Sequence, residues 1–343
     1  MTMTKIVALA TGLGLVFAGC VSAQTVTLAS TVPDNGVNKV VVEALKEELS
    51  NAAPDMTLDI FLDGTLGGEN ELIDLVRIGE TQLHMGVIHA SEYFPELDAT
   101  LVPYLLPDYE SVKRFLEGPI GEKMKTALEE KGNAKFLGTY YQGARWATSN
   151  KAFTTLPELN GIKIRMPEIP LWIDIWSGMG AVTTPMPSPE VFSALQTGVI
   201  DAQENMLSNI YGRKIYEVQD YLIATRHQQS YVTVMANLDF WNDLDEPQQQ
   251  ALQTAVDAAT KAGSDAAVDE NERIIGLIED AGVEVVEPKP EFREKALPII
   301  RTAADKVLAP GVYEAAIEAV DGTSAASGTS STSGKGDAAD AAK

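Results

Sequence analysis

The sequence contains very little cysteine and histidine. Cys20 is its only cysteine, and histidine occurs only at His84, His89 and His227. A single cysteine cannot build a disulfide framework within one chain. The histidines are widely spaced, and the sequence has no His-Glu-x-x-His motif, Cys/His cluster or EF-hand loop, so we expect no metal site and no cofactor. No Gly-x-Ser-x-Gly elbow of a serine hydrolase is present either.

Positive charge is also scarce. The 343 residues include 26 lysines and arginines against 49 aspartates and glutamates, which gives a formal net charge of −23. Nucleic acids and anionic membrane surfaces are bound by clustered Lys and Arg, so we expect neither as a partner. Any anionic ligand must be held by a few locally placed cations. The length and the 45% hydrophobic content are sufficient for two lobes, each with its own core.

Long hydrophobic runs are missing except near the N-terminus. The apolar run over residues 6–18 follows Lys5 and is shorter than the ~20 residues that span a bilayer. Small residues at 21–23 form a cleavage site, so residues 1–23 are predicted to be a signal peptide for export to the periplasm. Phe-Ala-Gly-Cys, ending at Cys20, resembles a lipoprotein box, which leaves a lipid anchor as the alternative. The small, polar residues 321–343 are predicted to be a disordered tail.

Strands and helices alternate along the first part of the chain. Periodicity and turn residues predict strands at 25–31, 56–62, 83–88 and 134–141, with helices at 40–49, 67–80, 109–116 and 121–131. This order is typical of an α/β fold with a mostly parallel sheet covered on both faces.

A second α/β block follows. Predicted strands are 161–166, one reaching Val182, 199–205 and 221–227; predicted helices are 171–177 and 188–198, with Ser188 as N-cap and Gly198 as the stop. Glu246–Asp280 lacks a breaking proline and predicts a helix of ~50 Å that crosses both lobes.

These elements together predict a two-lobed periplasmic-binding-protein fold with a cleft between the lobes. Lobe I comprises residues 24–142 plus 231–270, and lobe II residues 143–230 plus 271–320. We expect the ligand in the cleft, at the carboxyl ends of the strands.

Three polar side chains stand at predicted strand ends in lobe II. Arg145 follows the strand at 134–141, Arg165 ends the strand GIKIRM, and Asn205 ends the strand VIDAQEN. A guanidinium can hold a carboxylate through two parallel hydrogen bonds, and an amide can donate a third. The alternative is that each arginine forms a structural ion pair with one of the many acids.

The same residues lie in stretches that resemble the substrate-binding proteins of tripartite ATP-independent periplasmic (TRAP) transporters, the DctP-like family. The stretches are GARWATSNK, ELNGIKIRMPEIP and TTPMPSPEVFSALQTGVIDAQEN, and the resemblance extends from about Val26 to Val320. It implies that Arg165 pairs with the ligand carboxylate and that Arg145 and Asn205 support the same group. It also implies a cleft-spanning helix and the membrane permease subunits as partners.

Further residues are candidates for the rest of the pocket. The resemblance places His227 at the pocket in some relatives, and the remaining candidates are Glu69, Asn70, His89, Ser91, Ser188 and Tyr211. Trp172 and Trp176 stand one helical turn apart and are assigned to the core.

The predicted function is therefore capture and delivery of an organic acid by a monomeric binding protein that is not an enzyme. The polar candidates favour a sugar acid such as a uronate or aldonate. A C4-dicarboxylate or another monocarboxylate is the alternative ligand. The alternative class is an exported enzyme that acts on acidic sugars.

Overall fold

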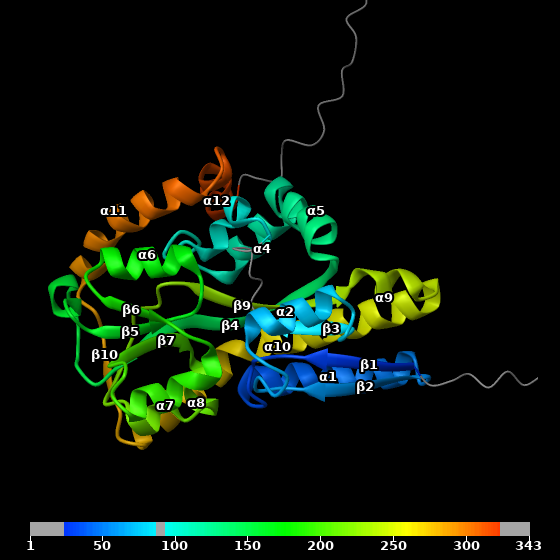
Figure 1. The fold of residues 1–343 in the computed structure, drawn as a ribbon, viewed down its shortest axis with the longest axis horizontal. Coiled ribbons are helices and arrows are strands. Elements are labelled where there is room, and N and C mark those ends of the chain that lie inside the picture. Colours follow the sequence, from blue (N-terminus) through cyan, green and yellow to red (C-terminus); the bar gives the residue numbers. More distant parts are fainter. Residues whose placement is uncertain (1–23, 87–92, 323–343) are drawn as a thin grey trace, which may run out of the picture.

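The computed structural model describes residues 24–86 and 93–322 (Figure 1). The predicted signal peptide with Cys20, the site candidates His89 and Ser91, and residues 323–343 of the predicted tail lie outside these ranges. In the described part of the chain, no helix is both long and apolar enough to cross a membrane.

The described residues form ten strands in one continuous sheet, in the order β2-β1-β3-β9-β4-β7-β5-β6, with β8 paired to both β4 and β10. The strands are β1 (Gln24–Ala29), β2 (Met56–Phe61), β3 (Leu83–Gly86), β4 (Ala134–Ser149), β5 (Lys163–Met166), β6 (Val182–Pro185), β7 (Ala202–Met206), β8 (Tyr221–Ile223), β9 (Gln229–Asn237) and β10 (Glu284–Val286).

The prediction of a mostly parallel sheet is wrong in the middle of the molecule. β1 pairs in parallel with β2 and β3, and β5 with β6 and β7, as expected for βαβ units. β9 was not predicted, and it runs antiparallel to both β3 and β4. β4 is also antiparallel to β7 and β8. The two long central strands, β4 and β9, therefore join the parallel strands at the two ends of the sheet.

β4 is longer than the predicted strand 134–141, and Arg145 lies within it rather than after it. Up to Ala144 it pairs with β9, from Arg145 to Ser149 it pairs with β7, and from Ala147 to Ser149 it also pairs with β8. The register shifts between Tyr141 and Gly143, where Gly143 adopts a φ of 89°. Such a bulge needs glycine, and it bends the strand as it passes from one half of the sheet to the other.

Two smaller predictions also fail. The strand predicted to reach Val182 instead begins there, because residues 182–185 pair with β5. Ser188 is not an N-cap: it is the first residue of a short 3₁₀ turn, and its hydroxyl caps no backbone N–H.

Helices surround the sheet. The α-helices are α1 (Gly36–Ala52), α2 (Glu69–Arg77), α4 (Tyr109–Glu117), α5 (Pro119–Gly132), α6 (Pro170–Gly178), α7 (Val191–Gln196), α8 (Leu207–Gly212), α9 (Leu238–Asp243), α10 (Glu246–Asp280), α11 (Pro290–Val307) and α12 (Val312–Asp321). The 3₁₀ turns are η1 (Pro95–Leu97), η2 (Ala99–Leu101), η3 (Leu156–Leu159), η4 (Ser188–Glu190) and η5 (Ile215–Val218).

The long helix predicted at Glu246–Asp280 is confirmed as α10, with the same bounds. Its N-cap is Asp245, whose side chain accepts a hydrogen bond from the Gln248 N–H at 2.9 Å. It packs against α1, β4 and α8, and so contacts both ends of the molecule. A side chain at Gly263 would meet Val41 of α1 at 2.3 Å, so glycine permits the close approach of the two helices.

The two-lobed α/β architecture is confirmed. Figure 1 shows α1, α2 and β1 to β3 gathered at one end, and α6 to α8 with β5 to β7 at the other. α12 packs against α4. The residue boundaries assigned to each lobe stay a prediction.

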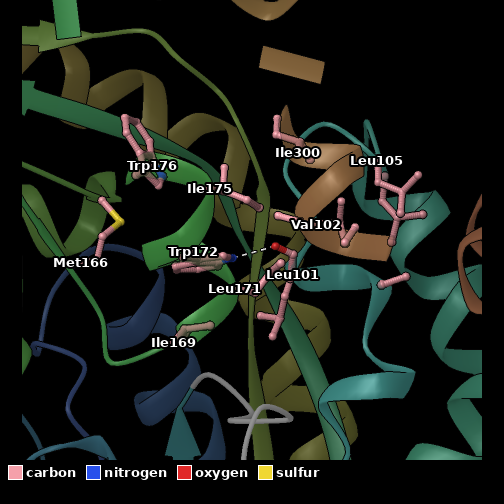
Figure 2. Close-up of a cluster of buried hydrophobic side chains, with 14 of the residues drawn as sticks. Leu101, Val102, Leu105, Met166, Ile169, Leu171, Trp172, Ile175, Trp176 and Ile300 are labelled. Carbon is pink, nitrogen blue, oxygen red and sulfur yellow. Dashed lines mark hydrogen bonds between the residues drawn. The ribbon is translucent and has the colours of Figure 1, made fainter. Parts of the chain in front are cut away.

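A large apolar core joins α6 to the loop after η2 and to α11 (Figure 2). Trp172 and Trp176 of α6 are buried in it, as predicted. The Trp172 indole N–H donates to the Leu101 carbonyl at 2.6 Å, the bond drawn in Figure 2. This packing anchors α6, which follows β5 and Arg165 in the chain.

Candidate ligand-binding site

A cavity lies between the two ends of the sheet. Its empty volume is about 660 Å³, a figure that includes space open to solvent. From the β1 and α2 end it is lined by Thr31, Val32, Glu69 and Asn70; from the other end by Arg145, Arg165, Pro167, Glu168, Ile169, Trp172, Met186, Pro187, Ser188, Asn205, Met206 and Asn209.

Two arginines line this cavity, and Arg165 is the one that forms no ion pair with a described residue. It lies near the end of β5 and is only 3% exposed. Its Nε and Nη2 donate to the Met186 carbonyl at 2.9 and 2.7 Å. Among the described residues no carboxylate lies within 4 Å of its guanidinium. Burial lowers the pKa of Arg165 to about 10, although nearby Glu204 acts in the opposite direction.

Arg145, by contrast, is already paired. Its Nε and Nη2 donate to the two carboxylate oxygens of Glu204 at 2.6 and 2.8 Å, and both side chains are buried. The register of β4 and β7 places Glu204 diagonally opposite Arg145 on the same face. The Arg145 guanidinium also lies over the Trp172 ring, 4.9 Å from its centroid. This geometry fixes the direction of the guanidinium at the cavity wall.

His227 lies behind the cavity wall rather than on it. Its Nε2 is 2.9 Å from Glu204 Oε2, and its Nδ1 is 2.9 Å from the Thr225 hydroxyl. Burial by itself favours the neutral form of Glu204, but the charge of Arg145 and the hydrogen bonds from both neighbours hold its pKa well below the usual range. Glu204 therefore stays ionised, and Arg145, Arg165 and Glu204 together carry one net positive charge.

Asn205 presents an amide at the same end of the cavity. Its Oδ1 accepts hydrogen bonds from the Met206 N–H and from Asn209 Nδ2, each at 3.0 Å. Because the oxygen is occupied, the opposite end of the amide, Nδ2, is the end available as a donor.

Glu69 and Asn70 line the opposite wall. Glu69 accepts a hydrogen bond from the Thr31 hydroxyl and lies 3.2 Å from His84 Nε2. His84 Nδ1 is 3.1 Å from the Ala29 carbonyl, which can only accept, so that nitrogen carries a proton. Asn70 Nδ2 donates to Glu168 at 3.3 Å, across the cavity.

A second contact joins the two walls. Arg213, after α8, donates to the Thr31 carbonyl at 2.6 Å and pairs with Asp63 at 3.0 Å. With the Asn70–Glu168 bond, it holds the two sides together over the cavity.

The structure brings together six of the predicted site residues: Arg145, Arg165, Asn205, Glu69, Asn70 and Ser188. Tyr211 does not line the cavity; it stacks on Tyr216 with 5.4 Å between ring centroids. In the described part of the chain, no group of three His, Cys, Asp or Glu residues could hold a metal ion.

Sequence reasoning missed Glu204, Asn209 and Thr31. Glu204 had a usable signal: Ala202 and Met206, two positions away on the same face of the strand, are apolar, and a carboxylate on a buried strand face requires a cationic partner. Asn209 and Thr31 had none, since nothing in their local sequence distinguishes them from ordinary helix and loop residues.

Comparison with known proteins gives consistent matches. Residues 28–309 match the family described as bacterial extracellular solute-binding protein, family 7 (DctP). A solute-binding protein of Roseobacter denitrificans is 31% identical over 268 residues, which cover 77% of this chain and 82% of the relative.

Two solved structures have the same fold. One is a TRAP periplasmic solute-binding protein from Roseobacter denitrificans with bound L-galactonate, with a TM-score of 0.81 and 27% identity over 87% of this chain and 99% of that one. The other is the sugar acid-binding protein from Advenella mimigardefordensis in complex with galactonate, with a TM-score of 0.79 and 25% identity over 87% and 99%. Both are named as binding proteins. The chain belongs to family 7 of the bacterial extracellular solute-binding proteins, the DctP family of TRAP transporter binding proteins.

Proposed function

We propose that the protein captures a sugar acid outside the cytoplasm and delivers it to the membrane permease subunits of a TRAP transporter. The observation that carries the proposal is the state of Arg165. A buried cation with only a backbone carbonyl as partner is costly, and a ligand carboxylate would remove that cost.

Each side chain at this end of the cavity has a distinct role in the proposal. Arg165 forms the main ion pair with the carboxylate. Asn205 donates through Nδ2 to the same group. Arg145, held by Glu204 and Trp172, supplies a fixed positive charge beside them. Matches to proteins with bound galactonate support a hydroxylated acid, and the polar residues Glu69, Asn70 and Ser188 provide partners for its hydroxyl groups.

The proposed mechanism is closure of the two lobes around an unchanged ligand. Closure excludes water from the ion pair and strengthens its hydrogen bonds. The carboxylates are already engaged: Glu204 accepts from Arg145 and His227, and Glu69 accepts from Thr31. This arrangement favours binding over acid–base catalysis. We place the mature protein in the periplasm, as a monomer without nucleic acid partners.

Thermal unfolding against a ligand panel tests the proposal. The mature chain from Gln24 is unfolded and refolded to remove any bound ligand, then mixed with D-galactonate, D-galacturonate or succinate. Galactitol and galactose are the neutral controls. A ligand at 100 times its Kd adds about 2.7 kcal/mol to stability, which corresponds to a rise in Tm of several degrees.

Only the acids are expected to raise Tm. A neutral control that stabilises the protein equally would contradict the carboxylate anchor. The ligand recovered after denaturation should be chemically unchanged. Recovery of a reaction product would favour the exported-enzyme alternative instead.

A further inference from the structure

Asn205 and Asn209 form a pair of amides whose orientation is set by the backbone. The Met206 N–H is a donor only, so the side-chain atom it meets at 3.0 Å must be the Asn205 oxygen. The Asn209 atom bonded to that same oxygen must then be its nitrogen. The direction of both amides is therefore determined without reference to any ligand.

This orientation leaves Asn209 Oδ1 as an acceptor without a donor. Asn209 is 7% exposed and lines the cavity, and its Oδ1 is buried with no hydrogen-bond partner in the described structure. A buried carbonyl oxygen without a partner costs free energy, so it is a place where a ligand group completes the structure.

The neighbouring groups do not have the same property. The Ser188 hydroxyl is also buried without a partner, but it can donate or accept and so does not discriminate between ligand groups. Glu69 already accepts from Thr31. Asn209 Oδ1 can only accept, and it therefore requires a donor.

We propose that Asn209 selects ligands that carry a hydroxyl group on the carbon next to the carboxylate. The inference rests on the proposed function, in which Asn205 Nδ2 donates to the carboxylate. The two amides are joined by one hydrogen bond and both line the cavity, so the donor of Asn205 and the acceptor of Asn209 lie on adjacent side chains of its wall. Adjacent side chains meet neighbouring groups of a small ligand, and a carboxylate with a hydroxyl on the next carbon is a 2-hydroxy acid.

The consequence is discrimination against acids that lack this hydroxyl. A 2-deoxy acid forms the same ion pair with Arg165 but leaves Asn209 Oδ1 buried and unpaired. A site built to bond a hydroxyl rejects the analogue without it more strongly than lost contact alone would predict. A ring-closed uronate has an ether oxygen on that carbon, which cannot donate.

The test compares matched acids on matched variants. Isothermal calorimetry measures Kd for D-galactonate and 2-deoxy-D-galactonate, and for malate and succinate, on the wild type, Asn209→Leu and Asn242→Leu. Asn242 is exposed on α9 and lies outside the cavity, so that variant is the control. Thermal unfolding of each variant verifies the fold.

The wild type and Asn242→Leu should prefer the hydroxylated acid of a pair by about tenfold or more. In Asn209→Leu that preference should fall to near one. Equal affinities on the wild type, or a preference that survives in Asn209→Leu, would overturn the inference while leaving acid binding intact. Failure of all four acids to bind the wild type would instead overturn the proposed function.

Discussion

Replacing Arg165 with methionine should separate ligand binding from stability. The substitution removes the charge but keeps a long apolar side chain in the cavity wall. Truncating one partner of a buried charged pair costs ~2–5 kcal/mol in binding. At 1.4 kcal/mol for each tenfold, this is a loss of affinity of roughly 30-fold to several thousandfold.

The stability of the unliganded protein should respond differently. A pKa lowered to about 10 means that the folded state disfavours the charged guanidinium. At neutral pH this lowers the unfolding free energy by about 3 kcal/mol. Methionine removes this cost but also the two hydrogen bonds to the Met186 carbonyl, worth ~1–3 kcal/mol. We therefore expect Arg165→Met to unfold at the wild-type temperature or slightly above it.

Calorimetry with D-galactonate and thermal unfolding without ligand measure the two quantities. Arg226→Met is the matched control, because Arg226 pairs with Glu287 outside the cavity and its loss changes the net charge equally. Unchanged affinity in Arg165→Met would refute the role of Arg165. A large fall in Tm would show that Arg165 is a structural residue.

Two further predictions concern the ion-paired residues Glu204 and Arg213. Glu204→Gln should lower the unfolding free energy by about 3 kcal/mol, because it leaves Arg145 buried without a counter-charge. The pKa of Glu204 is lower in the folded protein than in the unfolded chain. Ionised Glu204 therefore contributes to folding stability above the ordinary carboxyl pKa of about 4.3, and this contribution is lost as the pH falls below that value. Urea titrations at several pH values should show that acid lowers the stability of Glu204→Gln less than that of the wild type. Arg213→Met should weaken D-galactonate binding by about fivefold, because it removes a contact worth ~1 kcal/mol that joins the two walls. Small-angle scattering of that variant without ligand should give a larger radius of gyration than that of the wild type. An unchanged radius and an unchanged Kd would show that the Arg213 contact has no role in closure.

Elements with a local signal were predictable from the sequence. α10 has a capping aspartate, no interior proline and a long polar and small-residue pattern, so both of its ends could be assigned. β5 alternates apolar and basic residues and stops at Pro167, and this pattern placed Arg165 at its end.

The central strands were harder because their pattern is not alternating. β9 is buried along nearly all of its length, and the second part of β4 is buried on both faces, so neither shows the period of a half-exposed strand. Their antiparallel pairing joins segments far apart in the sequence. The Arg145–Glu204 pair depends on that register, which no local pattern carries.

The face of α10 that meets the rest of the protein has a further consequence. From Ala255 to Ala267 its buried positions are mostly small: Ala255, Val256, Ala259, Thr260, Gly263 and Ala267. Such a surface has few protruding side chains to interlock with α1 and β4, so it offers little resistance to small sliding movements. Ile274 and Ile278, larger side chains beyond this stretch, join the apolar cluster that contains α7 and α8. We therefore expect α10 to stay attached to α7 and α8 through Ile274 and Ile278, and the lobe that contains α1 to shift along its small-residue face.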